Sequence, residues 1–203
     1  MPKKYYAVRS GRETGIFDTW DECKRLVTGF KGAEYKSFTA LADAQEYLAR
    51  TVSTPVSDDY STLPDNEAVA YVDGSYNVKT KIFGYGAVVF NRGKAHTAYK
   101  GIDDKELAEM RNVAGEILGS MYAMEYCVRH EITTLYLYYD YAGIEKWCTG
   151  EWKCSKKGTT AYRDFYLKKK DVLTVNFIKV KGHSGNKYND LADELAKKGA
   201  GVD

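Results

Sequence analysis

Residues 51–66, TVSTPVSDDYSTLPDN, divide the chain into two segments that we expect to fold around separate cores. The stretch contains two prolines, three acidic residues and several small hydroxyl residues, and it has little apolar periodicity. Such a composition is typical of linkers, because it lacks the regularly spaced apolar side chains that a packed helix or strand requires. In the chain of 203 residues we therefore predict a first domain over 1–50, a linker over 51–66 and a second domain over 67–203.

The composition excludes several classes of protein. Hydrophobic residues make up 44% of the chain, which is enough for packed cores and argues against disorder. No apolar run approaches the roughly 20 residues of a membrane helix, and the N-terminus lacks the apolar stretch of a secretion signal. The four cysteines include no Cys-x-x-Cys pair, so we expect free thiols in a cytoplasmic protein. The net charge of +2 is too small to indicate a nucleic-acid partner by itself.

Apolar periodicity predicts a small α+β domain first and a larger α/β domain after the linker. In the first domain, short strands are expected at Tyr5–Val8, Ile16–Phe17 and Tyr35–Phe38. Its helices are expected from Trp20 to the stop signal Gly29 and at Leu41–Arg50. Strands of the second domain are expected at Ala68–Asp73, Gly84–Phe90, Lys94–Gly101, Leu135–Asp140 and Leu173–Val180. Its helices are expected at Lys105–Arg129, Ile144–Trp147, Ala161–Lys170 and Lys187–Lys198. This order predicts a mixed sheet with helices on its faces.

Two aspartates stand at the ends of hydrophobic strands. Asp73 closes VAYVD before Gly74 turns the chain, and Asp140 closes LYLYYD in the same way. Strand alternation places Val69, Tyr71 and Asp73 on one face. A lone aspartate at such a place commonly starts a turn or caps a helix, but two together favour a site at the end of the sheet.

Three further residues are candidates. Glu116 adjoins the apolar stripe of the long predicted helix, where a carboxylate is costly unless it is paired or bound to a cation, although a solvated side chain also fits. Asp193 lies in the closing helix, where an i, i+4 ion pair with Lys197 is the alternative explanation. His183 lies in the glycine-flanked loop KGHSG, and a histidine there is commonly only solvated. Several carboxylates without cysteine or histidine ligands suit magnesium better than zinc, and two-metal phosphodiester hydrolysis uses such a set.

Taken together, YVDGS, AGE, YYD and GHSG followed by NDLAD resemble type 1 ribonuclease H, from Glu67 to the end of the chain and in family order. The resemblance implies a ribonuclease H-like five-stranded mixed sheet with helices on both faces. It implies two Mg²⁺ ions, for which Mn²⁺ can substitute. It assigns the metal ligands Asp73, Glu116, Asp140 and Asp193, and it assigns His183 to proton handling and product release. The loop Tyr76–Lys81 departs from the family pattern and leaves Asn77 a weak candidate for contact with nucleic acid.

The first domain, with YYAV, GR-TGIF-TW and YKSF over residues 4–48, resembles the hybrid-binding domain that precedes many ribonucleases H. That resemblance implies an aromatic contact set of Tyr6, Trp20 and Tyr35 with Lys36 near a phosphate, whereas the alternative is that these rings form the small core. The basic protrusion of some family members is shortened here, and Lys153, Lys156, Lys157 and Arg163 are either a reduced basic patch or ordinary solvated side chains.

These resemblances imply an endoribonuclease that cuts the RNA strand of RNA–DNA hybrids and leaves 5′-phosphate and 3′-hydroxyl ends. The hybrid is the expected partner, with no membrane and no protein partner, and we expect a monomer. One alternative is a hybrid-binding protein with a silent nuclease domain. Another is a junction resolvase or transposase-like nuclease on the same fold, because the fold alone does not separate these functions.

Overall fold

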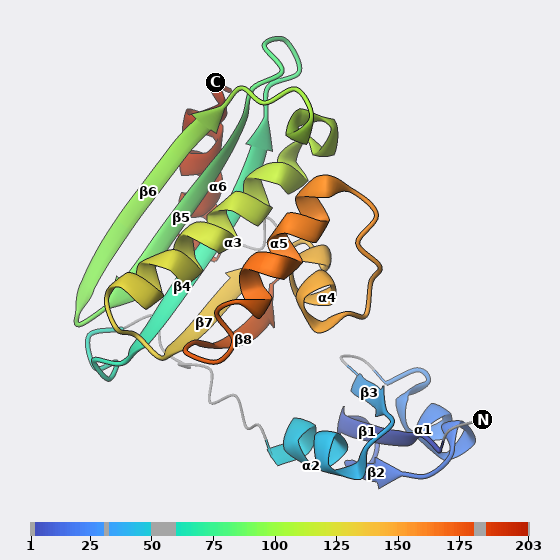
Figure 1. Cartoon of the computed structure of the whole chain (residues 1–203). Helices are drawn as coiled ribbons and strands as arrows, with labels where there is room; N and C mark the ends of the chain where they lie inside the picture. Colours follow the sequence, from blue (N-terminus) through green and yellow to red (C-terminus); the bar gives the residue numbers. More distant parts are fainter. Residues whose placement is uncertain (1–2, 31–32, 50–59, 181–185, 203) are drawn as a thin grey trace. The chain divides into compact units, whose positions relative to one another are not determined.

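The computed structural model describes residues 3–30, 33–49, 60–180 and 186–202, and the chain divides into two compact units, Met1–Ser53 and Thr54–Asp203. The two units are coloured blue to cyan and teal to red in Figure 1. No helix in the described ranges is both long and apolar enough to cross a membrane. All four cysteines are free thiols, as expected.

The first unit is a three-stranded antiparallel sheet with two helices. Its elements are β1 (Tyr5–Ser10), β2 (Gly15–Phe17), α1 (Trp20–Val27), β3 (Glu34–Phe38) and α2 (Leu41–Ala49), and the strand order is β2-β1-β3. Helix α1 begins at Trp20 because the side chain of Thr19 accepts a hydrogen bond from the backbone N–H of Glu22. Cys23 and Val27 of α1 pack on Val8 of β1, and these three side chains form a small core.

The second unit contains the predicted mixed five-stranded sheet. Its strands are β4 (Glu67–Tyr76), β5 (Phe83–Asn91), β6 (Lys94–Ile102), β7 (Thr134–Tyr139) and β8 (Thr174–Lys179). Its helices are η1 (Leu107–Met110), α3 (Asn112–Arg129), α4 (Gly143–Thr149), α5 (Lys157–Leu167) and α6 (Lys187–Ala200). The strand order is β6-β5-β4-β7-β8, with antiparallel pairing among β4, β5 and β6 and parallel pairing of β4 with β7 and of β7 with β8.

Helices cover both faces of this sheet, with α3, α4 and α5 on one face and α6 on the other (Figure 1). Glycines allow the close approach of the helices. A Cβ atom at Gly115 of α3 would lie 2.1 Å from the backbone oxygen of Gly84, and a Cβ atom at Gly86 would lie 2.0 Å from the backbone oxygen of Ala192 in α6. The main core lies beneath α3, α4 and α5 and includes Leu135, Leu137 and other fully buried side chains of the central strands.

Two predicted features differ in the structure. The helix expected over Lys105–Arg129 is interrupted at Arg111, whose φ of 53° is incompatible with a right-handed helix, so η1 and α3 are separate. In addition, part of the segment predicted as linker packs on the second unit. Tyr60 is 5% exposed, its hydroxyl lies 2.6 Å from that of Tyr71, and its ring packs on Phe90 and Tyr188. Tyr60, the one aromatic residue of the linker sequence, therefore extends the core of the second unit.

Candidate functional site

The first two aspartates lie just beyond the last paired residues of β4 and β7. Asp73 lies opposite Gly86 in the register of β4 and β5 and is 9% exposed, and its Oδ1 accepts a 2.6 Å hydrogen bond from the N–H of Gly74. Asp140 follows directly after β7, the parallel neighbour of β4. The sequence predicted that the strand would end at Asp73 and turn at Gly74, but β4 continues to Tyr76, because Gly74 to Tyr76 still pair with β5. Since β4 and β7 are parallel, the C-terminal end of β7 brings Asp140 beside Asp73.

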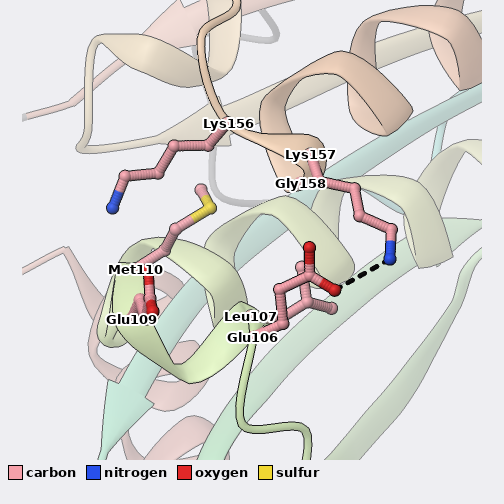
Figure 2. Close-up of a pocket in the computed structure, with 7 residues that line it drawn as sticks. All are labelled: Glu106, Leu107, Glu109, Met110, Lys156, Lys157 and Gly158. Carbon is pink, nitrogen blue, oxygen red and sulfur yellow. Dashed lines mark hydrogen bonds and ion pairs between the residues drawn. The ribbon is translucent and has the colours of Figure 1, made fainter.

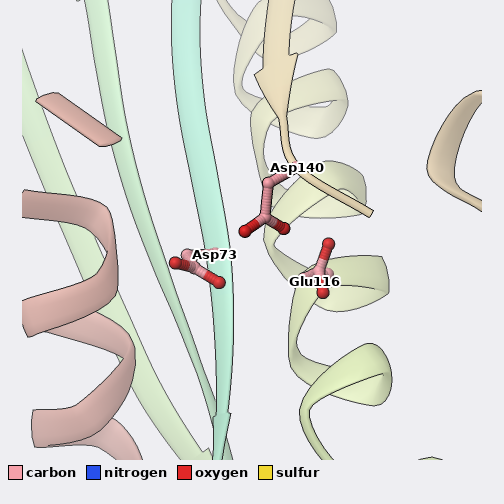
Figure 3. Close-up of side chains that lie close together, drawn as sticks. All are labelled: Asp73, Glu116 and Asp140. Carbon is pink, nitrogen blue, oxygen red and sulfur yellow. The ribbon is translucent and has the colours of Figure 1, made fainter. Parts of the chain in front are cut away.

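Glu116 reaches the same place from α3. Figure 3 shows the three side chains converging from β4, from the end of β7 and from α3. One carboxylate oxygen from each of Asp73, Glu116 and Asp140 lies within 4.8 Å of the others. A Cβ atom at Gly74 would lie 2.5 Å from the backbone nitrogen of Glu116. Glycine at this position of β4 therefore allows α3 to come close enough for Glu116 to reach the aspartates.

In the absence of a cation, ionisation of all three carboxyl groups is unfavourable, because they are close together and two of them are buried. Burial, followed by the charge of Asp140, raises the pKa of Asp73 to about 7. Burial and the charges of Asp140 and Asp73 raise the pKa of Glu116 to about 9. Glu116 is 1% exposed, and its Oε2 atom has no hydrogen-bond partner. A buried oxygen without a partner, beside two further carboxylates, fits a divalent cation with hard oxygen ligands.

Asp193 approaches the group from α6 but is not one of the three converging residues. It lies close enough for its charge to contribute to the raised pKa of Asp73. Its Oδ2 accepts a 2.7 Å hydrogen bond from the ammonium of Lys197 one turn later, so the ion pair expected as an alternative is present. Asp193 is thus paired with Lys197 and lies beside the carboxylate group.

Two other candidates are not placed in this group. His183 lies outside the described residues. The side-chain amide of Asn77 is already hydrogen-bonded at the surface: its Nδ2 donates to the backbone oxygen of Gly201 at 2.6 Å, and its Oδ1 accepts from the N–H groups of Lys79 and Thr80. Both ends of this amide therefore hold the turn after β4 against the end of α6.

In the first unit the predicted aromatic set forms one continuous surface. The ring of Trp20 lies 5.8 Å from the ring of Tyr6 and 5.8 Å from the ring of Tyr35. Trp20 is 41% exposed and Tyr35 is 45% exposed, whereas the core behind them consists of Val8, Cys23 and Val27. These rings are thus mostly a surface feature and only partly the core that the alternative interpretation expected.

Lys36 lies on the other face of the same sheet. Tyr35 is paired with Val8, which packs under α1, and Lys36 is the next residue, so its side chain points to the opposite face. There its ammonium lies 5.8 Å from the ring centre of Phe38, which packs against Tyr47 of α2. Within β3, the next residue on the same face as Tyr35 is Ser37. Alternation along the predicted strand Tyr35–Phe38 already implies that Tyr35 and Lys36 point to opposite faces, and the pairing with β1 decides which face packs under α1.

The shortened region between α4 and α5 is only partly basic. Lys157 pairs with Glu106 at 2.8 Å beside a small cavity of about 150 Å³ between η1 and the start of α5, with Lys156 on its rim (Figure 2). Trp152, which directly precedes Lys153, is 37% exposed and lies under the ammonium of Lys146 at 5.4 Å.

Known proteins resemble both units. Residues 4–48 match the family model described as the ribonuclease H1 N-terminal domain, and residues 65–201 match the model described as RNase H. A Saccharomyces cerevisiae relative named ribonuclease H is 30% identical over 157 residues, which cover 60% of this chain and 45% of the relative. Human ribonuclease H1 is 24% identical over 257 residues, which cover 97% of this chain and 89% of the human protein. The chain thus spans less than half of the yeast relative and most of the human one.

A solved structure has a similar fold. LC11 ribonuclease H1, determined in complex with an RNA/DNA hybrid, has a TM-score of 0.52 at 15% identity and covers 64% of this chain and 97% of that chain. At this level of identity the likeness concerns the fold of the second unit.

Proposed function

The chain belongs to the ribonuclease H family of enzymes, whose members are metal-dependent, and on that premise we propose that it hydrolyses the RNA strand of RNA–DNA hybrids with two magnesium ions. The observation that carries this proposal is the convergence of Asp73, Glu116 and Asp140 within 4.8 Å. The match of the first unit to the ribonuclease H1 N-terminal domain and the hybrid bound to LC11 ribonuclease H1 support the choice of substrate.

The carboxylates of the second unit supply the metal site in this proposal. Asp73, Glu116 and Asp140 hold the divalent ions, and Asp193 completes the set from α6. When bound, two Mg²⁺ ions stabilise charge on the attacking water and on the leaving oxygen of an in-line displacement, and Mn²⁺ can replace them. Burial of Glu116 and Asp73 keeps these oxygens away from bulk water, and a bound cation would displace the protons that the raised pKa values favour. The products carry 5′-phosphate and 3′-hydroxyl ends.

The remaining roles divide between the units. The surface of Tyr6, Trp20 and Tyr35 stacks on sugars or bases of the hybrid, which suits nucleic acid because each base presents an aromatic face. Lys36 stays a candidate for a phosphate contact through its charge, although it points to the other face. The connecting residues keep the first unit near the second and so raise the local substrate concentration. His183 is the candidate for proton transfer during product release.

The test is cleavage of a labelled RNA–DNA hybrid, with double-stranded RNA and double-stranded DNA as controls, in magnesium and in chelator. The expected result is magnesium-dependent internal cutting of RNA only in the hybrid. An Asp140→Asn variant should lose about 100-fold or more of this activity, because it removes one of the three converging anions. Glu109→Gln is the matched control, since Glu109 is exposed and lies outside the group. Hybrid binding without cleavage by the unaltered protein would contradict the proposal and favour a silent nuclease domain.

A further inference from the structure

The ion pair between Lys197 and Asp193 belongs to the carboxylate site and is more than a link within α6. Lys197 and Asp193 are one turn apart, with 2.7 Å between Nζ and Oδ2, and Asp193 has only 17% of its side chain exposed. An ordinary i, i+4 pair on a solvated helix face acts on its two members alone. Here the charge of Lys197 also lowers the pKa of Asp73, on the neighbouring strand β4, against the larger effect of burial.

The structure therefore places a single ammonium where it interacts with two of the four proposed ligand residues. One is Asp193, through a direct hydrogen bond, and the other is Asp73, through its charge. Asp193 also raises the pKa of Asp73, so the two anions repel each other and each is stabilised by Lys197. A divalent cation bound by the same two carboxylates would meet the positive charge of Lys197 at short range.

Lys197 is able to leave. Its side chain is 45% exposed, and lysine has a flexible stem with a strongly hydrated head, so a change of rotamer carries the ammonium into solvent. Glu116, by contrast, is buried and cannot move away from the group. The ion pair of Lys197 with Asp193 can therefore adjust more easily than the buried carboxyl of Glu116.

We propose that Lys197 is a built-in counter-ion of Asp193 that competes with a divalent cation, so that a cation binding at Asp193 displaces the ammonium. This inference rests on the proposed function, because it assumes that Asp193 and Asp73 are metal ligands. Lys197 is a positioning residue in this account: it sets how tightly the free enzyme binds the ion on the Asp193 side. Removing its charge while keeping its apolar stem tightens cation binding.

The test is the titration of full-length protein, without nucleic acid and at low salt, with Mn²⁺ followed by electron paramagnetic resonance and with Mg²⁺ followed by calorimetry. The variants are Lys197→Met, Lys197→Arg and the matched control Lys198→Met, which removes the same charge from a lysine that lies 4.7 Å from the ring centre of Tyr99. Lys197→Met should bind the more weakly held ion about fivefold more tightly, equal to ~1 kcal/mol at 25 °C. Lys197→Arg and Lys198→Met should stay within about twofold of the unaltered protein, and higher salt should reduce the difference.

The outcomes separate the two proposals. Unchanged binding in Lys197→Met, with normal binding by the unaltered protein, would overturn the competition and leave the metal site intact. Weaker binding in Lys197→Met would also overturn it, because Lys197 would then be holding Asp193 in its ligand position. An equal gain in Lys198→Met would reduce the effect to net charge and so reject it. Absence of binding in every variant would contradict the proposed metal site itself, and this inference with it.

Discussion

Replacing Glu116 with glutamine is expected to stabilise the metal-free protein, and to do so more at pH 8 than at pH 6. The side chain is 1% exposed, and burial with the charges of Asp140 and Asp73 raises its pKa to about 9. In the unfolded chain the pKa returns to about 4.5. Between these two values the folded protein holds a proton that the unfolded chain has released, so the free energy of unfolding falls as the pH rises. Glutamine has no such proton and keeps the shape of the side chain.

The size of the effect follows from the linkage between proton binding and folding. One proton held only by the folded state changes the free energy of unfolding by ~1.4 kcal/mol for each pH unit. Glu116 alone therefore lowers the stability of the metal-free protein by about 2 to 3 kcal/mol between pH 6 and pH 8. Asp73, whose pKa is raised to about 7, adds to this loss below pH 7 and little above it. The Glu116→Gln variant should keep only the part due to Asp73.

The assay is urea unfolding in chelator at pH 6, 7 and 8, followed by tryptophan fluorescence in a Trp20→Phe background. The remaining tryptophans, Trp147 and Trp152, then report on the second unit alone. Glu109→Gln is the matched control, because Glu109 is exposed and the same substitution there should leave the pH dependence unchanged. With saturating Mg²⁺ the order should reverse, since the unaltered protein gains stability from the bound ion and the variant loses a ligand.

A metal-free protein whose stability is constant or rises from pH 6 to pH 8 would refute this reasoning. It would mean that Glu116 is ionised at neutral pH without a cation, and that another group neutralises it. A Glu116→Gln variant with the same slope as the unaltered protein would refute the assignment of the slope to this residue.

Three further outcomes are expected. Trp20→Ala should weaken hybrid binding by ~1–3 kcal/mol in a fluorescence anisotropy titration, because the ring is exposed and available for stacking. Cleavage at saturating hybrid should be nearly unchanged, because Trp20 lies in the first unit. Unchanged affinity would argue against the aromatic surface. Tyr60→Phe should lower the free energy of unfolding of the second unit by about 1 kcal/mol, because it removes the hydrogen bond between the hydroxyls of Tyr60 and Tyr71. An unchanged urea midpoint would contradict this expectation. Gly86→Ala should cost about 3 kcal/mol or more, because its Cβ atom would overlap the backbone of α6, and a stable variant would show that α6 can shift.

Local sequence patterns were sufficient for most of the fold. Alternation in VAYVD and LYLYYD predicts two strands, and the structure contains β4 and β7 there; β7 stops directly before Asp140 as predicted, whereas β4 continues past Asp73 to Tyr76. Turn and capping residues gave the element boundaries within a few positions, because glycine and hydroxyl side chains act over a few residues. The break at Arg111 was not predicted, because an arginine with positive φ has no signature in the residue pattern. The packing of Tyr60 on Tyr71 was missed for a similar reason: it joins residues that only the folded sheet brings together.

The candidate site shows the same division. The sequence by itself identifies Asp73, Glu116 and Asp140 as acids on separate elements, and their order resembles a known family. It does not determine that their oxygens lie within 4.8 Å or that Glu116 lacks a partner for one oxygen. The physical reason is range: propensity, alternation and capping act between neighbours in the chain, whereas burial and the charge of one carboxylate on another depend on distances that exist only once the strands and helices have packed.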